Sequence, residues 1–554
     1  MEHSNKPVRM VQPESLKTEE YQIWSGGRGV DVWAMIHAAA TGNLDTIKAL
    51  VAREPRLVNC QYEYFHPIRF AVRENQRAVV DYLLEQGANP ADEAGETLVT
   101  TARDRGYHEL AVLLESLLES RYHMVAGGET IAAAIKAGDG KQLKALLEKD
   151  PTLVHAADAR GNQPIHWAAL TRQMDCIDYL LGCGADINAR RPDGARPLDL
   201  TNGDYHYRSW YRDLPATALR KHEVLVGWLI ARGAYCDISI AAKMGWLERV
   251  RELLDADPEL VNRIPVYDGY YSGLPLRCAA SAGHIEVVKL LLERGANPNE
   301  PEPGIAPLGG ALHSAIGGRH YEIVKLLLEH GANPNAPVES SGNCASMAKH
   351  VGASKELVTL LASYGGVLGV EMACYNGDVE ILASMLHANP KLRMNEGVSA
   401  LISEGHRQCM ELLLRHQPGM LKNAALRNEA WWASVSPKDP EYARWLIAQG
   451  LDINSSNWLG ITLLHRCAGK ANIEMATLCI EQGADINAVE GFHSSTPLGW
   501  AAREGKKEMV EWLLNKGADP TFPKEEPWAQ PLVLAQRRGH DAITALLLAW
   551  ASGT

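Results

Sequence analysis

The sequence predicts an all-α protein, an elongated solenoid of about sixteen copies of one helix–turn–helix unit. Two observations predict it. The segment VVKLLLERGANPN at 287–299 recurs as IVKLLLEHGANPN at 323–335. The glycines at 450, 483 and 517 are 33 and 34 residues apart, a period typical of solenoids. Because each unit buries its apolar face against its neighbours, a chain of 554 residues needs no single large core.

The first helix of each unit opens with a proline-containing block, such as QPIH at 163–166 or TPL at 496–498. Proline in the first turn of a helix loses no backbone hydrogen bond. An Ala-Ala pair follows at 168–169, 279–280 and 501–502. These small residues predict a short first helix that stacks closely on its equivalents.

The second helix of each unit carries the apolar run V-x-x-L-L-L, which forms one face of an amphipathic helix. A Gly-His or Gly-Asn pair separates it from the first helix. A glycine at its end supplies the left-handed cap. Turn-forming stretches such as DARG at 158–161 then lead to the next unit.

In this order the blocks resemble the ankyrin-repeat family, from about Val30 to Ala551. The resemblance implies that inner helices and short β-hairpin fingers line a concave groove, while outer helices form a convex back. It also divides the chain into a polar N-terminal segment, 1–28, and a solenoid, 29–554. Within the solenoid we expect an insertion at about 202–218 and irregular repeats at about 395–445.

Four units end in a different way, with proline in place of the Gly-Ala pair. They read EPRLVN at 54–59, DPTLVH at 150–155, DPELVN at 257–262 and NPKLRM at 389–394. Proline is expected to stop the second helix there. The variant opens blocks of about three units, which suggests duplication of a larger segment; alternatively, it is a second way to end the helix.

Function is expected where the repeat is broken, because an ordinary unit is scaffold. The largest break lies between Gly184 and Gly233, which are 49 residues apart. The surplus residues include Tyr205, His206, Tyr207, Trp210, Tyr211 and Arg212. Large amphipathic aromatic rings near water either pack against another part of the protein or contact a ligand. We therefore predict a ligand-contacting loop, the alternative being a flap folded over the adjacent repeat.

Two predicted finger tips carry similar residues. The first holds Tyr62, Tyr64 and His66 before Arg69, and the second holds Tyr267, Asp268, Tyr270 and Tyr271 before Arg277. Both arginines stand where the family's motif has histidine. His166 keeps the motif, so we expect a structural role for it, whereas the arginines are expected to contact a ligand or a carboxylate.

Two classes of function remain open. The first, favoured by the resemblance, is a scaffold that binds a partner protein or peptide in the concave groove through Tyr, Trp and Arg. The alternative is a small-ligand binding protein, for example one that binds a carbohydrate, or an unusual enzyme. His206, His66, Asp268 or Tyr207 would then act in acid–base catalysis. The confinement of unusual residues to a few repeats favours this alternative. We find no nucleophile elbow, phosphate-binding loop or zinc motif, which argues against an enzyme without excluding one, and no cofactor is predicted.

Composition excludes several partners. A net charge of −12 without any Lys/Arg-rich block argues against nucleic acid. No run of about 20 apolar residues and no secretory signal is present, so no membrane association is expected. The ten scattered cysteines are expected to be free thiols in the cytoplasm. His406, Cys409 and His416 fit the repeat's own pattern, so no metal site is predicted.

Overall fold

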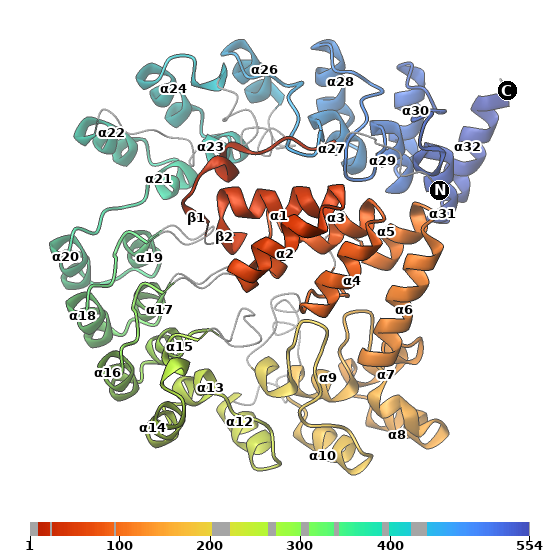
Figure 1. The fold of residues 1–554 in the computed structure, drawn as a ribbon. Coiled ribbons are helices and arrows are strands. Elements are labelled where there is room, and N and C mark those ends of the chain that lie inside the picture. Colours follow the sequence, from red (N-terminus) through yellow and green to blue (C-terminus); the bar gives the residue numbers. More distant parts are fainter. Residues whose placement is uncertain are drawn as a thin grey trace. The chain divides into compact units, whose positions relative to one another are not determined.

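The computed structural model describes residues 9–22, 25–92, 96–201, 222–263, 273–300, 310–336, 343–389, 398–422 and 440–552. The predicted all-α class is confirmed: these residues form pairs of short helices joined by turns (Figure 1). Within them the sheet content is a single two-stranded sheet, β1 (Tyr21–Gln22) paired antiparallel with β2 (Gly27–Arg28). No helix in the described part of the chain is long and apolar enough to cross a membrane.

The chain forms two compact units. The N-terminal unit comprises Glu20–Arg103 and Tyr107–Leu368. The C-terminal unit comprises Gly369–Thr554, together with the described residues 9–19 and the turn Asp104–Gly106.

In the N-terminal unit the helices follow one another in pairs, with short 3₁₀ helices (η) between some of them. They are α1 (Gly29–Thr41), α2 (Leu44–Arg53), η3 (Pro55–Asn59), α3 (Pro67–Arg73), α4 (Arg77–Glu85), α5 (Leu98–Asp104), α6 (His108–Tyr122), α7 (Gly127–Lys136), α8 (Gly140–Lys149), η4 (Pro151–His155), α9 (Pro164–Leu170), α10 (Met174–Gly182), η5 (Pro197–Leu200), α12 (His222–Ile230), α13 (Ile238–Lys243), α14 (Leu247–Ala256), η8 (Pro258–Val261), α15 (Pro275–Ala282), α16 (Ile285–Glu293), α17 (Ala311–Gly317), α18 (Tyr321–Glu329), α19 (Cys344–His350) and α20 (Lys355–Ser363).

The C-terminal unit repeats the same pairing. Its elements are η1 (Glu14–Lys17), α21 (Val370–Asn376), α22 (Val379–Ala388), α23 (Val398–Glu404), α24 (Arg407–His416), η9 (Met420–Lys422), α26 (Pro440–Ala448), α27 (Leu463–Lys470), α28 (Ile473–Glu481), α29 (Pro497–Arg503), α30 (Lys507–Asn515), η10 (Pro527–Ala529), α31 (Pro531–Arg537) and α32 (Asp541–Ser552).

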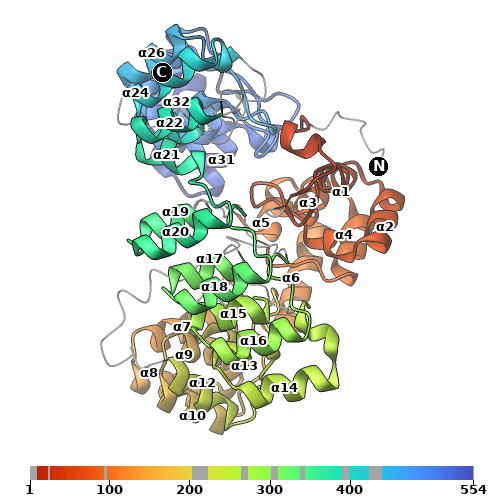
Figure 2. The same ribbon diagram turned by 90° about the vertical axis from the view of Figure 1, so that its left-hand side faces the viewer.

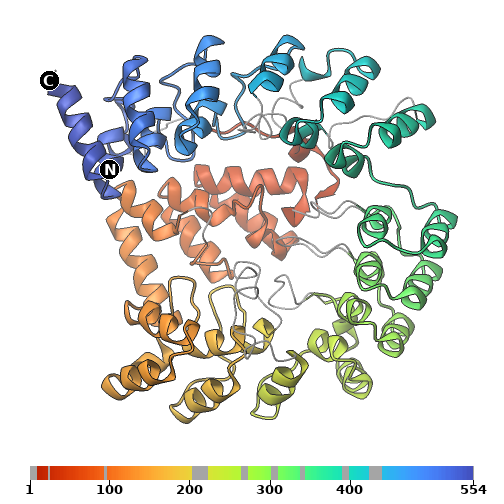
Figure 3. The same ribbon diagram turned by 180° about the vertical axis from the view of Figure 1, so that it is seen from behind.

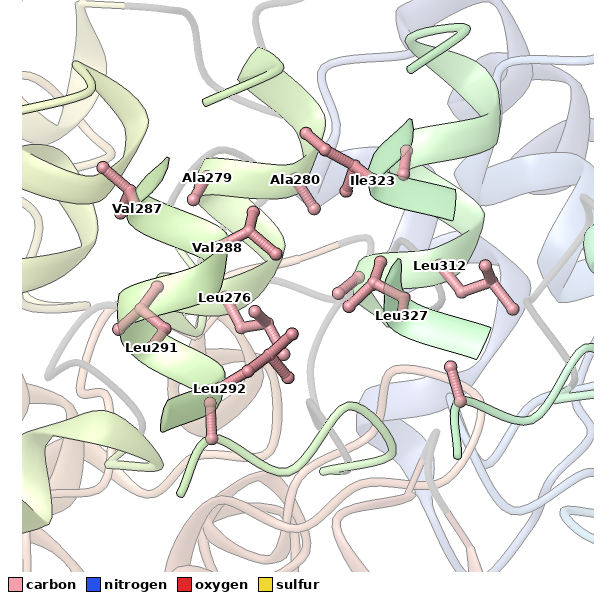
Figure 4. Close-up of a cluster of buried hydrophobic side chains, with 14 of the residues drawn as sticks. Leu276, Ala279, Ala280, Val287, Val288, Leu291, Leu292, Leu312, Ile323 and Leu327 are labelled. Carbon is pink, nitrogen blue, oxygen red and sulfur yellow. The ribbon is translucent and has the colours of Figure 1, made fainter. Parts of the chain in front are cut away.

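The pair α15 and α16 shows how the sequence makes one repeat. Pro275 opens α15, and Gly283, with a φ of 83°, ends it in the left-handed conformation. Val287, Val288 and Leu291 of α16 then turn inward. They pack with the small Ala-Ala face of α15 and with the following helix pair in one buried cluster (Figure 4). The predicted roles of proline, Ala-Ala, glycine and the leucine run are thereby confirmed.

Stacking of like helices builds each unit. First helices pack on first helices, as in α13, α15, α17 and α19, and in α27, α29 and α31. Second helices pack in a second layer, as in α14, α16 and α18. The two layers can be followed in Figure 2 for α15–α18 and from behind in Figure 3. Within each unit the buried hydrophobic residues form separate clusters, each made by several successive helix pairs.

The proline-type units end as predicted at the three places that the structure describes. The second helix stops before an extended residue, and proline then begins η3, η4 or η8. Asp150 and Asp257 cap two of these turns by accepting the N–H of Thr152 and Glu259. The fourth proline lies outside the described residues.

The fingers between repeats are tight hairpin turns, and an isolated antiparallel β-bridge between Ser456 and Thr462 flanks one of them. The backbone N–H of Asp158 donates to the carbonyl oxygen of Asn162 and closes the turn at 158–162, and equivalent bonds close the turns at 191–195, 457–461 and 490–495. At the N-terminus of the predicted solenoid, α1 begins at Gly29. The predicted insertion at 202–218 and parts of the irregular region at 395–445 lie outside the described residues, so these boundaries stay predictions.

Candidate functional site

The motif histidine is the reference for judging unusual residues. In α9, the Nδ1 atom of His166 accepts the backbone N–H of Gln163, so Nε2 donates. It reaches the carbonyl oxygens of Ala189 and Ala195 in the next finger, at 3.1 and 3.3 Å. Burial, and after it the nearby Arg191 cation, lower the pKa of His166 to about 3. His166 is therefore a neutral clamp between repeats, the structural role that the sequence predicts.

Arg69 performs the same task with another chemistry. Its Nη2 atom donates to the carbonyl oxygens of Asp92 and Glu96 in the next finger, at 3.1 and 2.9 Å. Its Nε atom donates to the carboxylate of Asp92 at 3.0 Å. The residue is buried, with 1% of its surface exposed. Its predicted contact with a carboxylate is present, but that carboxylate is the protein's own, and Nη1 alone has no partner among the described residues.

His66 lies at the rim of the same cluster. Its Nδ1 atom is 2.7 Å from Asp92 Oδ1, and a quarter of the side chain is exposed. Burial by itself would raise the pKa of Asp92, but the charges and hydrogen bonds of His66 and Arg69 outweigh it and lower the pKa. Asp92 is thus an ionised centre bound by both Arg69 and His66, and it holds His66 beneath the finger tip.

The tip itself is a two-residue hairpin. Tyr62 and Phe65 exchange backbone hydrogen bonds of 3.2 and 3.0 Å. The residues between them, Glu63 and Tyr64, have φ angles of 51° and 68°. Glycine or asparagine usually occupies such positions, because side chains there are crowded against the backbone. Tyr64 is 46% exposed.

Arg277, the second arginine at a motif position, is buried at the start of α15. Its charge acts on Lys243 of α13, a residue that the sequence analysis did not single out. The pKa of Lys243 is lowered to about 8, chiefly by burial. The cations of Arg277 and Arg172 also lower it, whereas Cys278 and Glu223 raise it. A lysine beside the Ala-Ala pair of α13 was the signal that could have found it.

The remaining predicted site residues lie outside the described part of the chain. They are Tyr205, His206, Tyr207, Trp210, Tyr211 and Arg212 of the insertion and Tyr267, Asp268, Tyr270 and Tyr271 of the second finger tip. Their predicted roles, including catalysis by His206, Asp268 or Tyr207, stay predictions.

A second cluster, missed from the sequence, precedes the insertion. Arg196 contacts Asp199 at 3.2 Å and Asp237 of the next repeat at 3.3 Å. Its guanidinium lies over the ring of Tyr235, 4.6 Å from the centroid. Burial raises the pKa of Asp199, with Arg196 opposing and Asp237 adding to the rise. The signal was the aspartate in RPLD at 196–199, which replaces the motif histidine.

In the C-terminal unit the fingers hold a buried acid. Glu490 accepts the backbone N–H groups of His493 and Ser495 and the indole N–H of Trp500. Burial raises its pKa, although these hydrogen bonds oppose the rise. In the finger before it, Asn457 accepts the N–H groups of two residues of its own turn. These fingers are rigid because their backbone donors are satisfied internally.

The described residues include every cysteine of the chain. All ten cysteines are free, six of them buried in helices and Cys60 in the turn after η3. Among those residues no group of three or more His, Cys, Asp and Glu is placed to hold a metal ion. The imidazole of His406 instead bonds the carbonyl oxygen of Tyr375 at 2.8 Å.

Comparison with known proteins agrees with this architecture. A stretch of 82 residues is 37% identical to the palmitoyltransferase ZDHHC17 of Rattus norvegicus and 38% identical to ZDHHC13 of Mus musculus. Each match covers 15% of this chain and 13% of the relative. A longer match, 28% identical over 295 residues, covers 50% of this chain and 11% of the ankyrin repeat and KH domain-containing protein mask-1 of Caenorhabditis elegans. The chain thus corresponds to a small part of each relative.

The family model for ankyrin repeats matches three segments, 98–191, 238–338 and 430–524, which together make up more than half of the chain. The matched segments contain the motif positions His166, Arg277 and His465 and the helix pair α15 and α16. Ankyrin repeats are protein-binding scaffolds, and this chain belongs to the ankyrin-repeat family.

Proposed function

We propose that this protein is a scaffold that recognises a segment of a partner protein on its fingers, with Tyr64 as a principal contact residue. The observation that carries the proposal is the hairpin of Tyr62 and Phe65. It presents an exposed tyrosine from a backbone conformation that costs a non-glycine residue about 1–2 kcal/mol. Strain of this kind concentrates where a ligand is contacted.

The base of this finger supports the same function. Arg69 and His66 both bind Asp92, and Arg69 also bonds two carbonyl oxygens of the following finger. The tip therefore stands on a buried and internally neutralised cluster. A partner that meets a rigid tip loses less entropy on binding, and tyrosine is among the residues that contribute most to interfaces.

A photo-crosslinking amino acid at position 64 tests the proposal in cells. The matched control is position 321, where Tyr321 is also exposed but begins the outer helix α18. We expect protein-sized adducts from position 64 and none of the same species from position 321. Identical adducts from both positions would contradict recognition at the finger.

Alanine substitution of the same two tyrosines gives the energetic test against the crosslinked partner. Tyr64→Ala should weaken binding by about 2 kcal/mol, because an interface tyrosine loses its whole ring contact. Tyr321→Ala should leave the affinity unchanged. The measurement is calorimetry with purified proteins, and equal affinities for both variants and the parent would reject the role of Tyr64.

A further inference from the structure

The N-terminal segment 9–13 of the chain lies on the fingers of the C-terminal unit, to which it belongs (Figure 1). Three successive fingers contact it. The backbone N–H of Val11 donates to the carbonyl oxygen of Trp458, at 2.9 Å, in the finger before α27. The guanidinium of Arg9 forms an ion pair of 3.1 Å with Glu526, in the finger before α31.

The middle finger is shaped to the segment. A Cβ atom on Gly491 would lie 2.4 Å from the carbonyl oxygen of Arg9 and 3.2 Å from its Cβ atom. The backbone of Arg9 therefore passes over a position where any other residue would collide with it. Gly491 itself donates to the carbonyl oxygen of Leu459 at 2.6 Å, which joins the middle finger to the one before it.

The contact has the form of a bound peptide. The segment is extended up to Pro13, whose φ and ψ are −62° and 149°. It adds a backbone hydrogen bond on one finger, a steric fit on the next and a charge pair on the third. The acidic residue Glu526 favours a peptide with an arginine, and the backbone contacts favour an extended peptide.

The segment is anchored at its C-terminal end, so that residues 9–11 can dissociate from the fingers. Pro13 and Leu16 are buried and anchor its C-terminal end at η1. Toward the N-terminus the side chains become more exposed: Val11 is 68% exposed, and the Arg9 side chain of the ion pair is more than a third exposed. A partly exposed ion pair exchanges readily with a competing ligand.

We infer that the fingers at 457–460, 490–495 and 524–527 form a binding site for an extended peptide that carries an arginine, and that residues 9–13 occupy this site in cis. The ligand class is an extended segment with arginine two residues before a residue whose amide donates to Trp458. This site lies in the C-terminal unit, whereas Tyr64 lies in the N-terminal unit. The two proposals are therefore tested independently of each other.

The first experiment tests the cis contact by hydrogen exchange of the Val11 amide in the full chain. The amide should be protected in the parent and at least 10-fold less protected in Gly491→Ala and in Arg9→Glu. Glu526→Arg should have the same effect as Arg9→Glu, and the double variant Arg9→Glu/Glu526→Arg should restore protection. The amides of α29 serve as the control, since a damaged finger would deprotect them too. An unprotected Val11 amide in the parent, or a double variant no better than its components, would overturn the inference.

The second experiment tests the site with a fluorescent synthetic peptide of residues 7–19. The full chain with Arg9→Glu has a weakened internal competitor, so it should bind the peptide at least 10-fold more tightly than the parent does. The same peptide carrying Arg9→Glu should not bind to either protein. Equal binding of the peptide by parent and variant, or binding by neither, would overturn a peptide site at these fingers.

Discussion

His166, Arg69 and Ser495 each connect one repeat to the finger of the next. His166 donates an imidazole N–H and Arg69 a guanidinium N–H, and both reach two carbonyl oxygens. Where the motif position is Gly499, the hydroxyl of Ser495 occupies the space of the missing side chain and donates to Ala529 at 2.7 Å. In these three repeats a side-chain donor bonds the next finger, and chemically different residues supply it.

The buried motif histidines predict a pH dependence of stability. The pKa values of His166 and His465 are lowered to about 3 and about 4, chiefly by burial, against about 6.5 in the unfolded chain. Their contribution is thus complete above pH 6.5 and decreases as the pH falls toward 4, because only the unfolded state takes up the protons. Urea unfolding at pH 7.5 and 5.0 should show this loss, at up to about 1 kcal/mol per pH unit and histidine.

The control for that experiment is the double variant His166→Gln/His465→Gln. It should be less stable than the parent at pH 7.5, because the clamps are weakened. It should also lose less stability on acidification, because glutamine does not titrate. An unchanged pH dependence in this variant would show that other groups cause the loss.

The strained finger tip predicts a gain of stability on substitution. Glu63→Asn/Tyr64→Gly places the preferred residues of a two-residue hairpin at the positive φ angles. We expect the free energy of unfolding to increase by about 1 kcal/mol, measured by urea denaturation, while partner binding weakens. A less stable variant would mean that the Tyr64 ring is packed for structure, and would remove the main argument for its function.

Arg69 shows how far single residues could be interpreted from the sequence. The arginine at a histidine position was correctly identified as unusual, and a carboxylate contact was among its predicted roles. Its partner Asp92 is 23 residues later, the same separation as between His166 and Ala189. The separation of 23 residues therefore predicts Asp92 as the partner of Arg69. That prediction requires knowing that Arg69 and His166 occupy equivalent positions and make equivalent contacts, which the contacts of His166 in the structure reveal.

At the scale of the helix, a glycine and a histidine of successive repeats are coupled. The imidazole of His320 donates to the carbonyl oxygen of Ser281 at 3.2 Å and lies against Gly283, where a Cβ atom would be 2.6 Å from the ring. His284, His406 and His540 lie against Gly245, Gly377 and Gly505 in the same way. The glycine ends its own helix and also makes room for the next repeat.

This coupling predicts unequal costs for two glycine substitutions. Gly295 has a φ of 89° with nothing near its Cβ position, so Gly295→Ala should cost only the left-handed conformation, about 1 kcal/mol. Gly283→Ala should cost about 1 kcal/mol more, because it also displaces His320. Thermal unfolding of both variants measures the difference. In a His320→Ala background the two costs should become equal, and a persistent difference would exclude His320 as the cause.

Most elements were predictable from the sequence because each one has a local signal. Proline, Ala-Ala, Gly-His and the leucine run recur at fixed spacing and define α15 and α16 without knowledge of the rest of the chain. The docking of 9–13 on the C-terminal fingers has no such signal. It depends on contacts between residues hundreds of positions apart, such as Arg9 with Glu526, and on the absence of a side chain at Gly491.

At the scale of the whole molecule, stability is local because each repeat packs on its neighbours. The core of α13–α20 is one cluster of buried residues, and the core of α27–α32 is another. The two clusters belong to different compact units. In such arrays a destabilising substitution should affect the adjacent repeats and have little effect on distant ones.

Two matched core substitutions test this locality. Leu291 of α16 and Leu513 of α30 are each completely buried, and truncation of such a leucine to alanine costs about 2–5 kcal/mol. Hydrogen exchange followed by mass spectrometry should show Leu291→Ala accelerating exchange in α13–α20 and leaving α27–α32 unchanged. Leu513→Ala should do the reverse, because its neighbours lie in the other cluster. If either variant accelerated exchange equally in both units, the chain would unfold as one cooperative body.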